Sequence, residues 1–162
     1  MFPHVEKLIK GETDMNARNL KLGALGGLLG GAVFGMMMGM MGMLPMIGQM
    51  VGQPSALVGF AVHMVNSAII GVGFAVVFGR TVAGFGSGTT TGMAYGIAWW
   101  LLGPLTLMPL FMGMGFGVNW SLAAARSMLP SLVGHIMYGL ILGTSYAWLR
   151  QRSLQPVTVT AS

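Results

Sequence analysis

The sequence predicts an all-α membrane protein whose four transmembrane helices form two tandem helical hairpins of the same orientation, a pseudo-twofold bundle. The 162 residues are 54% hydrophobic and only 7% charged, whereas a soluble domain carries about 25% charged residues. The charged residues gather near the chain ends and leave four apolar segments, each near the roughly 20 residues that a membrane-crossing helix needs. A histidine-containing pattern also occurs twice, at His63 and His135.

The charge distribution divides the chain into three parts. Residues 1–21 hold all three acidic residues and are predicted to be a cytoplasmic segment, in which Met15 is an alternative start to Met1. Residues 22–149 form the predicted transmembrane domain, with one repeat over about 22–78 and a second over about 91–149. Residues 150–162 are predicted to be a cytoplasmic tail.

The first hairpin is predicted from two long apolar runs. The run Leu22–Met43 exceeds the 7–15 apolar residues of a signal peptide, so we expect a retained span. The second span is expected after Pro54 and ends at Phe78, because proline fits the first turn of a helix. Gly48–Gln53 is the predicted short loop between them.

The second hairpin follows the same plan with more interruptions. Its first span is predicted over Thr91–Met112, where Pro104 should kink or end the helix because it lacks a backbone N–H. The last span is predicted over Pro130–Leu149. Glycine and threonine in Gly79–Thr90 predict a flexible turn, and Gly113–Leu129 is a longer predicted loop. The glycine-rich run Gly84–Gly92 lacks the lysine of a phosphate-binding loop and follows no strand.

The basic residues predict the orientation. With the N-terminus inside, one side of the membrane carries seven bases, and only Arg126 lies on the other side. The seven are Lys7, Lys10, Arg18, Lys21, Arg80, Arg150 and Arg152. The positive-inside rule then places both termini in the cytoplasm of a multi-pass protein of the cell inner membrane. These bases orient the chain and form no stripe that would bind nucleic acid.

Small residues four positions apart predict the faces on which the helices pack, because they let two backbones approach closely. The predicted packing residues are Gly23, Gly27, Gly31, Gly35 and Gly39 in the first span, Ser67 and Gly71 in the second, and Gly139 and Gly143 in the fourth. Gly71 and Gly143 correspond when the second and fourth spans are aligned on their histidines.

The two histidines are the polar residues of greatest interest within the spans. His63 lies four residues before Ser67 and His135 four before Gly139, so both rings should point into the bundle. One interpretation is a shared ligand site with Asn66 and Tyr138, which would bind haem b or a metal or act as a proton-sensitive gate. The other is two neutral rings bonded to helix carbonyls or to those two neighbours. The sequence itself requires no cofactor.

Methionines crowd the outer ends of the first and third spans. His63 and His135 with Met43, Met46 and Met112 are candidate metal ligands, since thioethers suit Cu(I). An adaptable surface for lipid or another subunit is the favoured interpretation, because eight methionines between Met36 and Met50 cannot all face one ion. The chain has no cysteine and no acidic residue within a span, which excludes thiolate chemistry and a carboxylate proton relay.

Three stretches resemble a family of small, functionally uncharacterised four-span membrane proteins of bacteria and archaea: GFAVHMVNSAIIGVGFA, YGIAWWLLGPLTLMPL and VGHIMYGLILGTSYAWL. Some members carry a histidine kinase label, which this chain does not support because it has no kinase ATP-binding signature. The resemblance implies the four spans but no activity.

The expected function is therefore that of a non-enzymatic integral membrane protein, a small accessory or structural subunit of a larger assembly such as a respiratory or electron-transfer complex. Its expected partners are the lipid bilayer and either a second copy or another membrane subunit. A haem- or copper-binding protein is the alternative, and a small channel or transporter is the third hypothesis.

Overall fold

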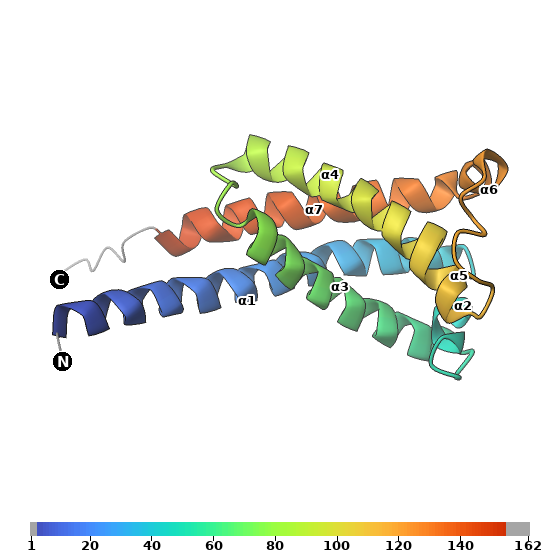
Figure 1. Ribbon diagram of the computed structural model, residues 1–162, viewed down its shortest axis with the longest axis horizontal. Coiled ribbons are helices and arrows are strands. Elements are labelled where there is room, and N and C mark those ends of the chain that lie inside the picture. Colours follow the sequence, from blue (N-terminus) through green and yellow to red (C-terminus); the bar gives the residue numbers. More distant parts are fainter. Residues whose placement is uncertain (1–2, 155–162) are drawn as a thin grey trace.

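Four long helices run along one axis of the molecule (Figure 1). The computed structural model describes the backbone of residues 3–154 and the side chains of residues 16–153. Its elements are α1 (Pro3–Met40), α2 (Leu44–Gln49), α3 (Ala56–Phe78), α4 (Phe85–Leu102), a π-helical turn η1 (Gly103–Leu107), α5 (Met108–Phe111), α6 (Leu122–Ser127) and α7 (Leu129–Leu154). The first residues of α1 and the last residues of α7 lie at the same end of the molecule, opposite α2, α5 and α6 (Figure 1).

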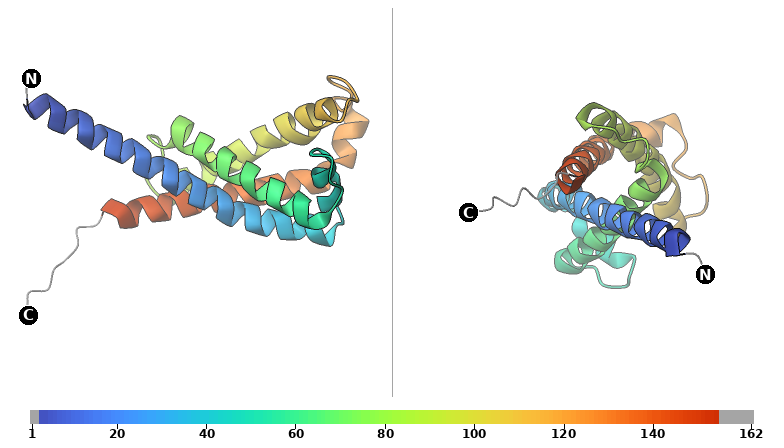
Figure 2. Two further views of the ribbon diagram at one scale, coloured as in Figure 1. Left: turned by 90° about the horizontal axis from the view of Figure 1, so that it is seen from below. Right: turned by 90° about the vertical axis from the view of Figure 1, so that its left-hand side faces the viewer.

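The four predicted spans are present, and no strand occurs in residues 3–154. Helices long and apolar enough to cross a membrane cover Asn16–Met40, Ala56–Phe78, Phe85–Phe111 and Leu129–Ser153. The protein is thus an all-α membrane protein of two tandem hairpins, α1 with α3 and α4 with α7. Helix α1 also begins well before the predicted span and projects beyond the other long helices (Figure 2).

The predicted flexible turn Gly79–Thr90 is wrong in its second half, since helix α4 begins at Phe85. Ser87 caps this helix: its hydroxyl accepts hydrogen bonds from the backbone N–H groups of Ala83 (2.9 Å) and Gly84 (3.1 Å). Glycine and threonine are poor helix formers in water. Here the glycines lie in a helix–helix contact, where the absence of a side chain permits close packing.

Each hairpin is closed by backbone-to-backbone packing at glycines. In the first hairpin, a Cβ on Gly23 would clash with the Gly71 carbonyl, and one on Gly27 with the Ser67 carbonyl. The second hairpin repeats this geometry with Gly88 against Gly143 and Gly92 against Gly139. Such proximity places Cα–H groups against carbonyl oxygens, a weak but repeated stabilisation between helices.

The two hairpins join through α1 and α7 on one side of the bundle. A second glycine row on α1 receives α7: a Cβ on Gly26 would lie 3.0 Å from the Leu142 carbonyl oxygen, and one on Gly30 would lie 2.8 Å from that of Tyr138. Leu142 and Tyr146 of this face are fully buried. One helix therefore packs closely against two neighbours.

The symmetry-related side, between α3 and α4, is open. When Gly23, Gly27 and Gly31 are superposed on Gly88, Gly92 and Gly96, the position of Gly30 is taken by Tyr95. Tyr95 reaches across to α3, where its hydroxyl donates a 3.0 Å hydrogen bond to the Ile70 carbonyl and its ring lies 5.4 Å from that of Phe74. A tyrosine in place of a glycine holds α4 away from α3.

The third span does not end at Pro104, because a π-helical turn accommodates the proline. The Thr106 hydroxyl donates a 2.8 Å hydrogen bond to the Leu101 carbonyl, five residues earlier. The span then continues through α5 to Phe111. π-Turns occur frequently at functional sites, and Gly103 and Pro104 line the cavity described below.

Arg150 connects α7 to the end of α3. Its guanidinium donates 2.6 Å hydrogen bonds to the carbonyls of Gly79 and Val82 at the C-terminal end of α3. A cation is favourable there because the last carbonyls of a helix lack intrahelical partners. This residue therefore fixes the contact between the two hairpins at the end of the molecule where α1 begins and α7 ends.

Candidate functional site

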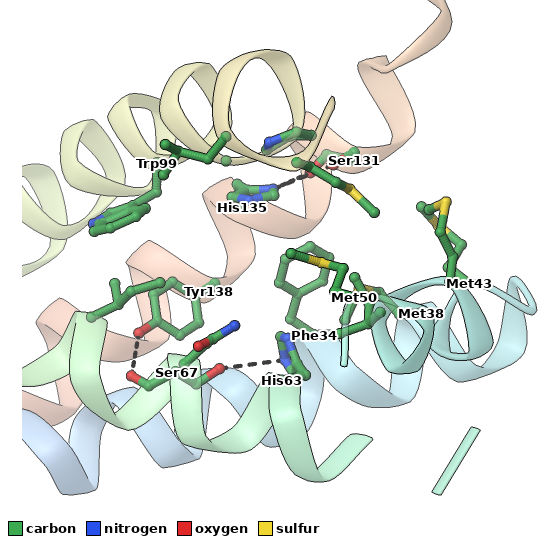
Figure 3. Close-up of a pocket in the computed structure, with 18 of the residues that line it drawn as sticks. Phe34, Met38, Met43, Met50, His63, Ser67, Trp99, Ser131, His135 and Tyr138 are labelled. Carbon is green, nitrogen blue, oxygen red and sulfur yellow. Dashed lines mark hydrogen bonds between the residues drawn. The ribbon is translucent and has the colours of Figure 1, made fainter. Parts of the chain in front are cut away.

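A cavity of about 310 Å³ lies in the half of the bundle away from the termini, between α3 and the third span (Figure 3). All four spans and the α2 region contribute to it. Its walls include Phe34 from α1, His63, Asn66 and Ile69 from α3, Trp99 from α4, Gly103 from η1, and Ser131, His135 and Tyr138 from α7. Ile69 is 63% exposed, which places the mouth on the membrane-facing side of α3.

The cavity contains three pairs of residues that the repeat relates. His63 pairs with His135 and Asn66 with Tyr138 in α3 and α7, while Phe34 pairs with Trp99 in α1 and α4. The site therefore lies where the two hairpins face each other. The structure brings together all four sequence-predicted ligand candidates: His63, His135, Asn66 and Tyr138.

The His63 ring is fixed against α1. Its Nε2 lies 2.9 Å from the Gly31 carbonyl oxygen, and the Ser67 hydroxyl lies 3.4 Å from the same nitrogen. A carbonyl oxygen only accepts, so Nε2 carries the proton and donates it. A Cβ on Gly35 would lie 3.0 Å from His63 Cδ2, which shows that the Cδ2–Nε2 edge faces α1 and the opposite edge faces away.

The His135 ring is fixed by its own helix. Its Nδ1 lies 2.8 Å from the Ser131 carbonyl oxygen, four residues earlier, and therefore donates to it. The other ring nitrogen, Nε2, lies 3.8 Å from the position of a Cβ on Gly103, across the cavity wall. Each histidine therefore donates a hydrogen bond from one ring nitrogen to a backbone carbonyl, and its other ring nitrogen makes no hydrogen bond within the described residues.

Phe34 lies between the two imidazoles (Figure 3). Its ring centroid lies 5.4 Å from that of His63 and 4.9 Å from that of His135, both in edge-type contacts. The phenyl ring therefore packs against both imidazoles and connects them through α1.

The related residues Asn66 and Tyr138 have different environments. Tyr138 is buried, and its hydroxyl donates a 2.8 Å hydrogen bond to the Ser67 carbonyl, which links α7 to α3. Asn66 is exposed on the cavity wall and has no hydrogen-bond partner among the described side chains and backbone. Its carboxamide is therefore free for a guest.

Some methionines line the cavity and others do not. Met38, Met43, Met46, Met50 and Met108 are lining residues, which includes two of the three thioether candidates. The third, Met112, is exposed outside the lining. No cluster of three or more histidine or acidic side chains capable of holding a metal occurs within residues 16–153.

The predicted packing residues fall into two groups. Gly23, Gly27, Gly31, Ser67, Gly71, Gly139 and Gly143 lie at the helix–helix contacts described above, and Gly35 faces the Phe60 and His63 rings. Gly39 lies outside the packed ridge: it is exposed, and its nearest neighbour is the Leu44 side chain. The ridge ends one turn earlier because α1 ends at Met40.

Sequence reasoning missed Phe34, Trp99 and the α4 glycines. The available signal was the spacing of Gly88, Gly92 and Gly96, which matches that of Gly23, Gly27 and Gly31 in α1 and aligns Phe34 with Trp99.

Comparison with protein-family models, curated proteins and solved structures finds no match for this chain.

Proposed function

We propose that the protein is a non-enzymatic integral membrane protein that binds a lipid-soluble small molecule in the cavity between α3 and the third span. The observation that carries this proposal is the cavity itself, which combines apolar walls with a few convergent polar groups. Ligand pockets have this composition and range from about 300 to 1,000 Å³. A mouth on a membrane-facing helix suits a guest that arrives from the bilayer.

The same protein would serve as a small accessory subunit of a larger membrane assembly. The outer end supports this role, because large apolar residues remain exposed there beyond the spans. Among them, Met114 is 58% exposed, Phe116 is 66% exposed and Trp120 is 58% exposed. Exposed apolar patches of this kind mark interaction surfaces. Native mass spectrometry of gently extracted membranes tests the role, and an exclusively monomeric protein without partners contradicts it.

A cavity-filling variant tests ligand binding. A Cβ on Gly103 would face His135 across the cavity, so Gly103→Leu should fill the space. Gly86→Leu is the matched control, because a Cβ there meets nothing within 4 Å. We expect wild type and Gly86→Leu to bind an environment-sensitive apolar dye and to retain a co-purified small molecule in native mass spectra, and we expect Gly103→Leu to lose both. Equal binding by all three proteins would refute the assignment to this cavity.

Cu(I) binding is the second candidate, and it rests on the five thioethers around the same cavity. Thioether sulfur with imidazole nitrogen is a suitable donor set for Cu(I). Titration of the purified protein with Cu(I) against a competing chelator tests it. One tightly bound ion that is lost when Met43 and Met46 are both replaced by leucine would establish this candidate over an organic guest.

A further inference from the structure

The hydrogen-bonding character of the cavity indicates the chemical class of its guest, an inference that rests on the proposed ligand-binding function. Both imidazoles are fixed by backbone carbonyls that can only accept hydrogen bonds, Gly31 O for His63 and Ser131 O for His135. In a neutral imidazole with one protonated nitrogen, the other nitrogen is an acceptor. His63 Nδ1 and His135 Nε2 are therefore acceptors.

These two nitrogens have no protein donor. Within residues 16–153, no hydrogen bond reaches His63 Nδ1 or His135 Nε2, although both residues line the cavity. The Tyr138 hydroxyl, a possible donor nearby, is already bonded to the Ser67 carbonyl. Both residues are only partly buried and line the cavity, so a guest that carries a hydrogen-bond donor would give these acceptors the partner that the protein does not supply.

The other residues that line the cavity favour a guest with an aromatic head group. Phe34, Trp99 and Phe111 contribute aromatic rings, and methionines fill the spaces between other lining residues. Aromatic rings and thioether sulfur both make favourable contacts with another aromatic ring. A volume of about 310 Å³ accommodates a small head group, and an attached chain can leave past Ile69 between α3 and α4.

We propose that the guest is a lipid-soluble phenol whose hydroxyl donates a hydrogen bond to a free imidazole nitrogen, while its alkyl chain lies between α3 and α4 in the bilayer. Asn66 on the same wall provides a second contact for a ring oxygen substituent, because its carboxamide both donates and accepts. A guest with only carbonyl or anionic oxygens would face two acceptors and be disfavoured.

The test compares 4-octylphenol with its methyl ether 4-octylanisole, which keeps the ring, the oxygen and the alkyl chain but carries a methyl group in place of the donor hydrogen. Binding to the intact protein in nanodiscs is measured by tryptophan fluorescence and by calorimetry. We expect the phenol to bind about fivefold to tenfold more tightly than the ether, as one neutral hydrogen bond contributes about 1 kcal/mol. This comparison requires no variant, so it remains decisive even if substitutions impair folding.

Variants then locate the acceptor. His63→Phe or His135→Phe should abolish the preference for the phenol, whereas the lining variant Met50→Leu should keep it. Equal affinity for the two probes, reduced by Gly103→Leu, would overturn the phenol assignment and leave ligand binding intact. Failure to bind either probe or the apolar dye would overturn the proposed function as well.

Discussion

Tyr138 and Tyr146 occupy the same face of α7, eight residues apart, yet they use their hydroxyls differently. Tyr138 donates to the Ser67 carbonyl, whereas the buried Tyr146 hydroxyl has no partner in the described part of the chain. The repeat offers an explanation, because the counterpart of Tyr146 in α3 is Phe74, which needs no partner. Two identical side chains therefore contribute differently to stability.

This difference predicts opposite outcomes for one chemical change. Tyr138→Phe should lower the free energy of unfolding by about 1 kcal/mol, because it leaves the buried Ser67 carbonyl without this donor. Tyr146→Phe should be neutral or stabilising, because it removes a buried hydroxyl that makes no hydrogen bond. Unfolding of the purified variants in mixed micelles with increasing SDS measures both values. Equal losses in the two variants would contradict the assigned hydrogen-bonding pattern.

At the candidate site, the sequence predicts the direction of the two histidine rings but not their protonation. The spacing of His63 to Ser67 and of His135 to Gly139 predicts rings that point into the bundle, since residues four apart share a helix face. The protonated nitrogen of each ring could not be predicted. It depends on Gly31 of another helix for His63 and on the local carbonyl of Ser131 for His135.

At the scale of the element, glycine spacing decides which helices touch. The sequence predicts the α1 ridge because Gly23, Gly27 and Gly31 lie in an evidently apolar run. It predicts a turn over Gly79–Thr90, of which the second half is helical, because glycine and threonine have poor intrinsic helix propensity. Packing against α7 overrides that propensity, and tertiary packing cannot be read from a local window.

The two ridges should respond alike to an added methyl group. Gly27→Ala and Gly92→Ala place a Cβ against the carbonyls of Ser67 and Gly139, so each should lower the free energy of unfolding by roughly 1–3 kcal/mol through overpacking. Gly86→Ala is the control in the same helix as Gly92, with open space around its Cβ. It should cause no loss, because alanine is the better helix former. SDS unfolding again measures the effect, and a loss confined to one hairpin would argue against equivalent ridges.

At the scale of the whole molecule, the cavity exists because the two repeats differ at one position of the helix–helix contact. Gly30 lets α1 and α7 close one side, while Tyr95 at the corresponding position holds α4 away from α3 on the other. A perfect duplication would close both sides and leave no mouth toward the membrane. The sequence predicts the duplicated hairpins from the α3 and α7 match, but the broken symmetry depends on aligning α1 with α4, where few residues other than glycine agree.

The arrangement of the ends predicts the topology in the membrane. Two hairpins of the same orientation place the loop between α3 and α4 on the side of the termini, together with the described bases Arg18, Lys21, Arg80, Arg150 and Arg152. By the positive-inside rule this side should be cytoplasmic. The opposite end, with α2 and α6, should then face outward.

Single cysteines report this topology without background, because the native chain contains none. Gln53→Cys after α2 and Ala123→Cys in α6 lie at exposed positions of the outer end, and Ala83→Cys lies at an exposed position of the inner loop. In intact cells, a membrane-impermeant maleimide should label the first two variants, and Ala83→Cys should react only after permeabilisation. Labelling of Ala83→Cys alone would reverse the orientation. Labelling of only one of the two outer positions would contradict the parallel hairpins, because an even number of spans must return both loops to the same side.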